Sequence, residues 1–445
     1  MVPAFFWAMI ILVGALVIKS NKNRQGDYKY FMPNILAKMF FGVAYGVFYL
    51  FVYGGGDTSA YFDAAVTLNN LFFKSPELYF EQLLSAPNHF QFTTFYDSTT
   101  GYPPGWIFRE PEGFFVSKII SVLSFFTLKS YFAMTFILAT FTAHASWKLF
   151  QLVRSYNFCS ERIIAIGILF LPSVNFWCSG ISKDSVVFIA SMYMIYHSFT
   201  IISKEHKTSI INVIMVMLMA FIIFHIRSFV LVAIIIPLFF SISARIVRIL
   251  GGGNMAVIAF RTIILGSSIV FLGSTIVLQS EKDFISSTSV LQQASSIQHD
   301  FQNNDTYGNK KYDLGDIEFT SIGLIKVMPI AVLTGMYRPF IWEALSATLI
   351  LNGIESLVLL YLTFLFFRKG FLKKWRLIRS HEFLIFSIIF ILIIAFMTGM
   401  TSVLYGVLVR LRSPLLPFLV ILLTVDYTKF SSSESKANKA LENAE

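Results

Sequence analysis

One short stretch of this sequence combines residues that could carry out acid–base chemistry. Residues 54–61 read Gly-Gly-Gly-Asp-Thr-Ser-Ala-Tyr and follow a run of mostly apolar residues. Asp57 and Tyr61 are four residues apart, so a helix would place both side chains on one face. A partly desolvated carboxylate at the edge of a membrane can act as a general base, and we expect Tyr61 on the same face to take part in substrate binding. The alternative interpretation is structural, with Asp57 as the N-cap of the helix that follows.

A second set of residues could bind an anion. These residues interrupt apolar sequence and are Lys183, Asp184, Arg227, Arg338, Arg410 and Arg412. Guanidinium groups suit bidentate contacts with phosphate oxygens, and few acidic residues stand beside these arginines in the sequence. The diphosphate of a lipid carrier is one ligand of this kind. Each arginine could instead be an interfacial anchor whose charged head reaches the polar surface, and Lys183 and Asp184 could simply begin a helix.

The composition indicates that the elements carrying these residues lie in a bilayer. Of the 445 residues, 56% are hydrophobic and 13% are charged, whereas about a quarter of a soluble domain is charged. Crossing a membrane takes about 20 apolar residues per helix. We therefore expect an all-α, polytopic membrane protein with about 11 transmembrane helices. The expected spans are 2–18, 38–53, 131–150, 163–178, 185–203, 209–225, 228–244, 256–279, 344–366, 382–400 and 413–428.

The spans divide the chain into six expected segments. They are two N-terminal transmembrane helices in 1–53, an outer loop with interfacial amphipathic helices and the candidate catalytic Asp57 in 54–130, a transmembrane bundle in 131–279, a second outer loop in 280–343, C-terminal transmembrane helices in 344–428, and a disordered cytoplasmic tail in 429–445. The stretch 321–336 is apolar but short and contains Lys326 and Pro329, so whether it crosses the membrane stays open.

The distribution of positive charge predicts the orientation. With the N-terminus outside and the C-terminus in the cytoplasm, 22 of the 35 Lys and Arg residues fall on the inner side, as the positive-inside rule requires. The candidate site residues then all lie on the outer face of a multi-pass cell (inner) membrane protein. The net charge of +10 is mostly this topology signal, so the expected partner is the lipid bilayer and not nucleic acid.

Signatures of soluble enzymes are missing from the sequence. There is no phosphate-binding glycine-rich loop with its lysine, no His-Glu-x-x-His and no Gly-x-Ser-x-Gly. Cys159 and Cys178 are expected on opposite sides of the membrane, which excludes a pair or a cysteine metal site. We expect no cofactor and no obligatory metal.

The stretch Gly-Asp-Thr-Ser-Ala-Tyr-Phe-Asp-Ala-Ala, residues 56–65, resembles the start of the first outer loop in the GT-C class of integral-membrane glycosyltransferases. The stretches 171–185, 337–344 and 408–418 are similar to uncharacterised membrane proteins of bacterial surface-polysaccharide gene clusters. The resemblance implies transfer of a sugar from a polyprenyl-phosphate carrier to a glycan or glycolipid acceptor in cell-envelope polysaccharide biosynthesis. It implies that Asp57 deprotonates the acceptor hydroxyl while the outer arginines hold the phosphate. The nearest second carboxylate, Asp63, is expected on another face.

Two other functions fit the same sequence. A lipid-linked polysaccharide polymerase or O-antigen-type ligase would also use outer arginines to hold a lipid diphosphate, and it fits better if Asp57 is only a cap. A flippase or secondary transporter would use Glu355, within an expected span, to couple protons. The sequence predicts neither the sugar, nor the acceptor, nor the oligomeric state.

Overall fold

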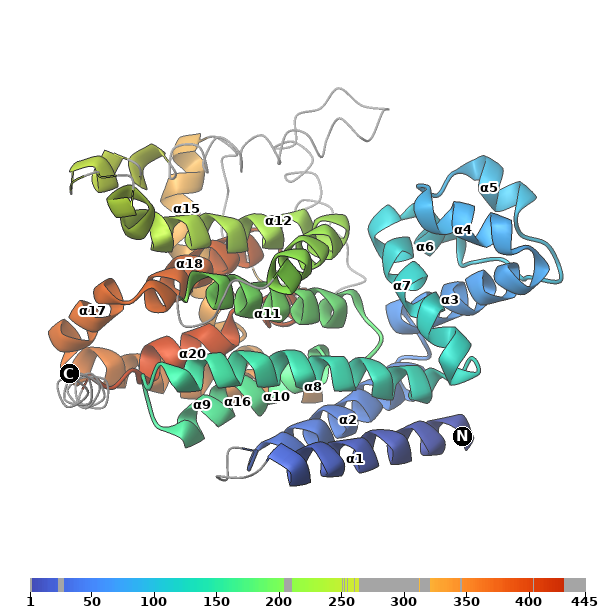
Figure 1. Ribbon diagram of the computed structural model, residues 1–445, viewed down its shortest axis with the longest axis horizontal. Coiled ribbons are helices and arrows are strands. Elements are labelled where there is room, and N and C mark those ends of the chain that lie inside the picture. The colour runs from blue at the N-terminus through green and yellow to red at the C-terminus, as the bar shows by residue number, and fades with distance from the viewer. Residues whose placement is uncertain are drawn as a thin grey trace. The chain divides into compact units, whose positions relative to one another are not determined.

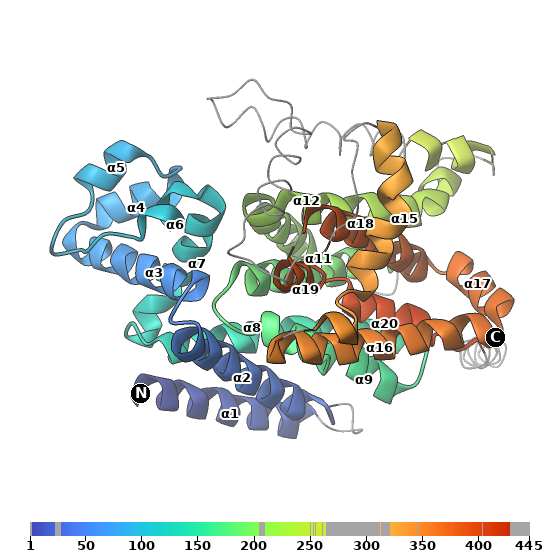
Figure 2. The ribbon, with the colours of Figure 1, turned by 180° about the vertical axis from the view of Figure 1, so that it is seen from behind.

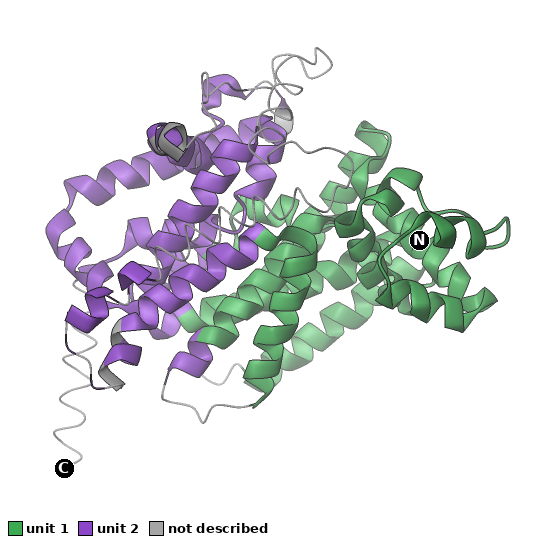
Figure 3. Cartoon of the chain, turned by 90° about the horizontal axis from the view of Figure 1, so that it is seen from above, with its two compact units in different colours: residues 1–152, 168–198, 208–228 green, residues 153–167, 199–207, 229–445 purple. Residues whose placement is uncertain are grey.

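The computed structural model describes most of the chain, and every element in the described part is a helix (Figure 1). The described residues are 2–22, 28–203, 210–249, 251, 253, 255–259, 261–263, 312, 321–344, 346–402 and 404–427. The predicted all-α class is confirmed for these residues. The chain forms two compact units (Figure 3), of which unit 1 comprises residues 1–152, 168–198 and 208–228, and unit 2 comprises residues 153–167, 199–207 and 229–445.

Long apolar helices indicate a bilayer environment. Within the described residues, six helices are long and apolar enough to cross a membrane, and the number rises to eight if each of two bent helix pairs forms one span. The six are Val2–Lys22, Phe31–Val52, Lys183–Ile202, Ile210–Ser243, Leu349–Arg368 and Glu382–Thr401. The described part of the chain thus has the helices of a multi-pass membrane protein, but the expected count of about 11 is not confirmed.

Two of the expected spans are not single straight helices in the structure. The expected span 163–178 consists of α9 (Glu161–Leu169) and α10 (Pro172–Trp177), because the residue before Pro172 is forced out of the helical region. The expected span 413–428 contains α20 (Leu416–Thr424), which is bent by 69° from α19 (Tyr405–Leu411). Most of the expected span 256–279, most of the second outer loop and the tail 429–445 lie outside the described residues.

The segment α12 (Ile210–Ile249) is interrupted at one residue. Arg227 has φ −151° and ψ 83°, which is not helical. A straight helix over the 34 residues Ile210–Ser243 would be about 51 Å long, well above the roughly 30 Å of a hydrocarbon core. The interruption at Arg227 coincides with the turn that the sequence predicts between residues 225 and 228.

Unit 1 contains four long helices, the first half of α12, the short helix α10 and a lobe of five further helices. The long helices α1 (Val2–Lys22) and α2 (Phe31–Val47), with the π-helical turn η1 (Phe48–Val52), lie side by side (Figures 1 and 2). The others are α8 (Tyr131–Ser155) and α11 (Lys183–Ile202). Lys38, the first residue of the expected span 38–53, is instead in the middle of α2 and fully buried, with its Nζ 5.6 Å from the centre of the Phe188 ring.

The five shorter helices occupy the expected outer loop 54–130. They are α3 (Asp57–Lys74), α4 (Pro76–Leu84), α5 (His89–Thr94), α6 (Gly105–Arg109) and α7 (Pro111–Thr127). The lobe is well packed, since α3 lies against α4, α6 and α7 around Leu68, Leu71 and Phe114, which are wholly buried. It also exposes Phe73 and Leu84 at 71% and 90%, as an amphipathic lobe at a membrane interface would.

Unit 2 is built around a close crossing of two helices. Its elements are α15 (Ser321–Tyr337), η3 (Ile341–Glu343), α16 (Ala347–Arg368), α17 (Phe371–Ser380), α18 (Glu382–Thr401), α19 and α20, together with α9 and the second half of α12. Helices α15 and α18 pack against each other along Ala331, Gly335, Ala395 and Gly399 (Figure 2). Small residues four apart on both helices let the two backbones approach closely.

This crossing has no room for a larger side chain. We expect Gly399→Ala to destabilise unit 2, because a Cβ at residue 399 would lie 1.9 Å from the backbone oxygen of Ala331. Overpacking of this kind costs about 1–3 kcal/mol or more. The apparent melting temperature of the purified full-length protein in detergent measures the effect. Gly406→Ala is the control, since its Cβ would meet no atom within 4 Å; equal melting temperatures would contradict the proposed crossing.

Candidate functional site

Asp57 is the first residue of α3 and follows a turn made by three glycines. Gly54, Gly55 and Gly56 have φ values of 71°, 120° and 125°, which residues with a Cβ rarely adopt. The N-cap is Gly56, whose N–H donates to Ser59 Oγ at 3.1 Å while the Ser59 hydroxyl donates to the Gly56 carbonyl at 2.9 Å. The interpretation of Asp57 as the N-cap is therefore wrong. Its half-buried carboxylate lies in the first turn, where the helix dipole favours negative charge.

Two contacts hold the first two turns of α3 in place. Thr58 Oγ1 and the Tyr131 hydroxyl are 2.6 Å apart, which ties the start of α3 to the start of α8. Tyr61 is only 1% exposed, and its ring packs against Gly113 of α7. In the described structure Tyr61 thus braces α3 against α7, and its role in substrate binding stays a prediction.

Three of the residues singled out in the sequence form ion pairs in unit 1. Lys183, the first residue of α11, pairs with Glu110, and its Nζ is 4.0 Å from Glu112 Oε2. Asp184 is 3% exposed, and its Oδ1 is 2.6 Å from Arg227 Nη1. The interruption of α12 at Arg227 is where this guanidinium meets the start of α11.

One of these ion pairs lies next to the helix that carries Asp57. A Cβ placed on Gly113 would be 2.7 Å from Glu110 Oε2 and 3.4 Å from the Tyr61 ring. The Glu110–Lys183 pair is therefore adjacent to Tyr61, one helical turn along α3 from Asp57. Chemically, this neighbourhood offers a carboxylate as a proton acceptor and paired cations that an incoming anion could engage.

The arginines of unit 2 form a separate cluster. Arg338 donates to Glu343 Oε1 from Nε at 2.9 Å and from Nη2 at 2.6 Å. Its guanidinium lies 5.4 Å from the centre of the Tyr312 ring and 6.0 Å from that of Tyr405, within the range of cation–π attraction. Burial raises the pKa of Tyr312, which keeps this hydroxyl neutral, and it donates to the Gly399 carbonyl at 3.0 Å.

Arg412 is wholly buried, and its hydrogen bonds go to neighbouring groups of the protein. Its Nη1 donates to the Arg338 carbonyl at 2.6 Å, and its Nη2 donates to Ser356 Oγ at 3.2 Å. Glu355 of α16 is close enough to act on it electrostatically. Arg410, in the last turn of α19, is half-buried. The structure thus brings Arg338 and Arg412 together, and the substrate contacts expected of Arg338, Arg410 and Arg412 stay predictions.

The fold supplies acidic partners that the sequence does not reveal. Asp184 and Arg227 are far apart in the chain, and Glu110 stands 73 residues from Lys183. The argument that the outer arginines have few acidic neighbours therefore fails for Arg227 and for Arg338, which have carboxylate partners. No spacing rule relates Glu110 to Lys183, so Glu110 and Glu112 could not be found from sequence. Glu343 was visible as the last residue of the stretch Tyr-Arg-Pro-Phe-Ile-Trp-Glu.

The described part of the chain contains no group of three or more His, Cys, Asp or Glu side chains that could hold a metal ion.

Comparison with protein-family models, characterised proteins and solved structures gives no match to this chain. The functional argument therefore depends on the geometry of the two clusters and on the chemistry of their side chains.

Proposed function

We propose that this protein is an integral-membrane glycosyltransferase that moves a sugar from a polyprenyl-phosphate carrier to a glycan or glycolipid acceptor. The observation that supports this function best is the position of Asp57. Asp57 is half-buried in the first turn of α3, shortly after an apolar span and at the start of a packed lobe of short helices. The N-cap is Gly56, so Asp57 is the first residue inside the helix.

The proposed reaction is a displacement at the anomeric carbon of the donor sugar. Asp57 accepts the proton of the acceptor hydroxyl, and the acceptor oxygen forms a bond to the anomeric carbon. The bond from that carbon to the carrier phosphate breaks, and its electron pair leaves with the phosphate. Cationic groups that face the phosphate lower the barrier, because negative charge develops on it in the transition state.

The lobe α3–α7 supports the proposal in a second way. Exposed apolar residues on α3 and α4 suit contact with lipid, while Tyr102, which precedes α6, and Trp106, which is in α6, are 55% and 47% exposed. Aromatic rings that combine an apolar face with a polar edge are favoured where one side is wet. A carrier lipid and a hydrophilic acceptor would both find contacts on such a lobe.

Within unit 2, we propose that Arg338 and Arg410 are the residues suited to binding a phosphate and that Arg412 has a positioning role. Arg338 is partly exposed, at 23% of its side chain, and its fork already makes two donor contacts to one carboxylate. A phosphate can take the place of such a carboxylate, because its oxygens can accept the same pair of hydrogen bonds from the guanidinium group. Arg412 instead bonds to the backbone carbonyl of Arg338.

A lipid-linked polysaccharide polymerase or an O-antigen-type ligase is the second candidate. The observation that favours it is the cluster of unit 2, where Arg338 lies against two neighbouring tyrosine rings and beside Arg412. In that function the arginines would hold a lipid diphosphate and Asp57 would not be essential.

Deletion of the gene, with glycans and lipid-linked precursors profiled by mass spectrometry, distinguishes these functions. We expect the deletion strain to lose one sugar or one branch and to accumulate the corresponding polyprenyl-phosphate-linked sugar. Accumulation of complete repeat units without long chains would instead support the polymerase or ligase. An unchanged glycan profile would overturn both and would favour the flippase or transporter.

A further inference from the structure

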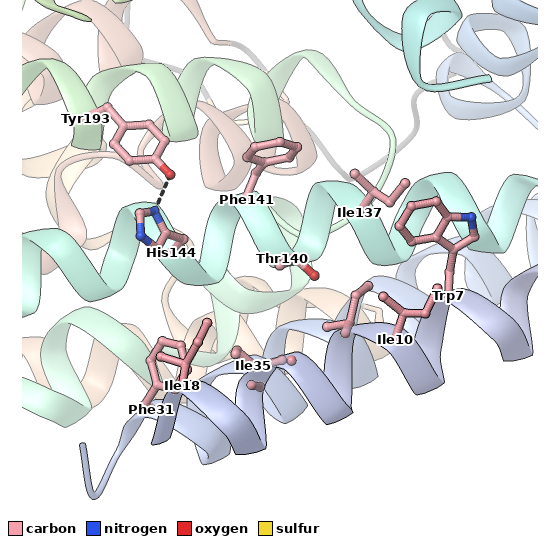
Figure 4. Close-up of a pocket in the computed structure, with 13 residues that line it drawn as sticks. Trp7, Ile10, Ile18, Phe31, Ile35, Ile137, Thr140, Phe141, His144 and Tyr193 are labelled. Atoms are coloured by element: carbon pink, nitrogen blue, oxygen red, sulfur yellow. Dashed lines mark hydrogen bonds between the residues drawn. The ribbon is translucent and has the colours of Figure 1, made fainter. Parts of the chain in front are cut away.

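An apolar groove in unit 1 is not used by the proposed reaction. It has a volume of about 490 Å³ and lies among α1, α2, α8 and α11 (Figure 4). The residues at its walls are almost all apolar, including Ile10, Ile18, Ile35, Ile137 and Phe141. On α1 it extends from Trp7 to Ile18, which is about 16 Å at 1.5 Å per residue. This length is about half of a hydrocarbon core of roughly 30 Å, so the groove matches one leaflet.

The two ends of the groove differ in polarity. At one end, the Trp7 indole donates to the Phe126 carbonyl at 3.0 Å. At the other end, His144 Nδ1 and the Tyr193 hydroxyl are 2.6 Å apart (Figure 4). Three further groups at this end act electrostatically on His144: Lys148, Lys22 and His197.

The lysines give this end a positive charge. Lys148 is one helical turn from His144 on α8, and its Nζ lies 5.4 Å from the centre of the Tyr196 ring. Lys22 is in the last turn of α1 and is exposed. The groove thus has an apolar body and a cationic mouth, which is the complement of a lipid with a negatively charged headgroup.

We propose that the groove binds one acyl chain of an anionic membrane lipid, with the phosphate of its headgroup at Lys22 and Lys148. The helix α1 precedes the span that leads to Asp57 and forms one wall of the groove. Gly14 lies in this wall, and a Cβ built on it meets no atom within 4 Å. The missing side chain at residue 14 therefore leaves space for a ligand. This assignment does not depend on the proposed function.

Native mass spectrometry of the full-length protein tests the assignment with two probes, phosphatidylglycerol and phosphatidylcholine of equal chain length. We expect Gly14→Leu to weaken binding of both lipids about tenfold, because the new side chain displaces methylene groups from the groove. We expect Lys148→Gln to weaken phosphatidylglycerol alone, about fivefold, as the loss of one lysine near a lipid phosphate predicts.

Matched control variants separate the groove from general effects. Val13→Phe adds bulk to the exposed face of the same helix, since Val13 is 53% exposed and does not line the groove. Lys373→Gln removes an exposed positive charge from α17. Neither control should change binding. Wild-type binding in Gly14→Leu, equal losses in Val13→Phe, or equal affinity of the wild type for the two lipids would each overturn the assignment.

Discussion

Asp57→Asn is expected to abolish sugar transfer while the protein is produced in normal amounts. Asparagine has nearly the shape of aspartate, but its amide cannot accept the acceptor's proton. Loss of a general base lowers rates by about 10²–10⁴-fold, which would leave no detectable product in cells. The helix itself should persist, because Gly56 and Ser59 make the N-cap contacts. Complementation of the deletion strain, with surface glycans profiled by mass spectrometry, measures the effect.

Asp63→Asn is the matched control for this substitution. Asp63 is on the same helix, six residues later and exposed, so the same change of charge is made on another face of α3. We expect Asp63→Asn to restore the glycan as fully as the wild-type gene does. Equal loss of function in both variants would point to the charge of the helix and not to base catalysis.

The largest effect on stability is expected for Arg412→Met. The substitution keeps an apolar side chain of similar length but removes the donors to the Arg338 carbonyl and to Ser356. It also removes the positive charge that acts on Glu355, which is only 8% exposed. Each buried acceptor left without its donor costs about 1–3 kcal/mol, and the Glu355 carboxylate also loses the opposite charge near it. The apparent melting temperature of the purified protein in detergent should fall clearly.

A second substitution shows whether the electrostatic interaction is the cause. Glu355→Gln added to Arg412→Met removes the buried carboxylate as well, so the double variant should recover part of the lost stability. Arg412→Lys keeps the positive charge but loses the planar set of guanidinium donors. We expect its apparent melting temperature to lie between those of the wild type and Arg412→Met. Additive losses in the double variant would contradict the coupling of Arg412 to Glu355.

The helices that could be predicted best from the sequence are long and uninterrupted. The expected spans 344–366 and 382–400 correspond closely to α16 (Ala347–Arg368) and α18 (Glu382–Thr401), because hydropathy over some twenty residues is a strong signal. The break at Pro172 was missed because the apolar character continues across it. The position of Lys38 was also missed, since a lysine near the end of an apolar run usually reaches the membrane surface.

The candidate site could be predicted only in part, for a related reason. Asp57 and its glycines are adjacent in sequence, so their unusual pattern was visible, although the alternative interpretation placed the N-cap at Asp57 and not at Gly56. The partners of Lys183 and Arg227 come from other helices, and tertiary packing alone brings them together. The burial of Arg412 likewise depends on carbonyls 74 and 76 residues away.

The most direct test of the proposed function is transfer by purified protein. Membranes from the deletion strain supply the lipid-linked donor and the acceptor, and mass spectrometry follows both after wild-type protein or Asp57→Asn is added. We predict that wild type consumes a polyprenyl-phosphate-linked sugar and increases the acceptor mass by one sugar, while Asp57→Asn does neither. Equal product from the two proteins, or consumption of a diphosphate-linked oligosaccharide instead, would contradict a transferase with Asp57 as its base.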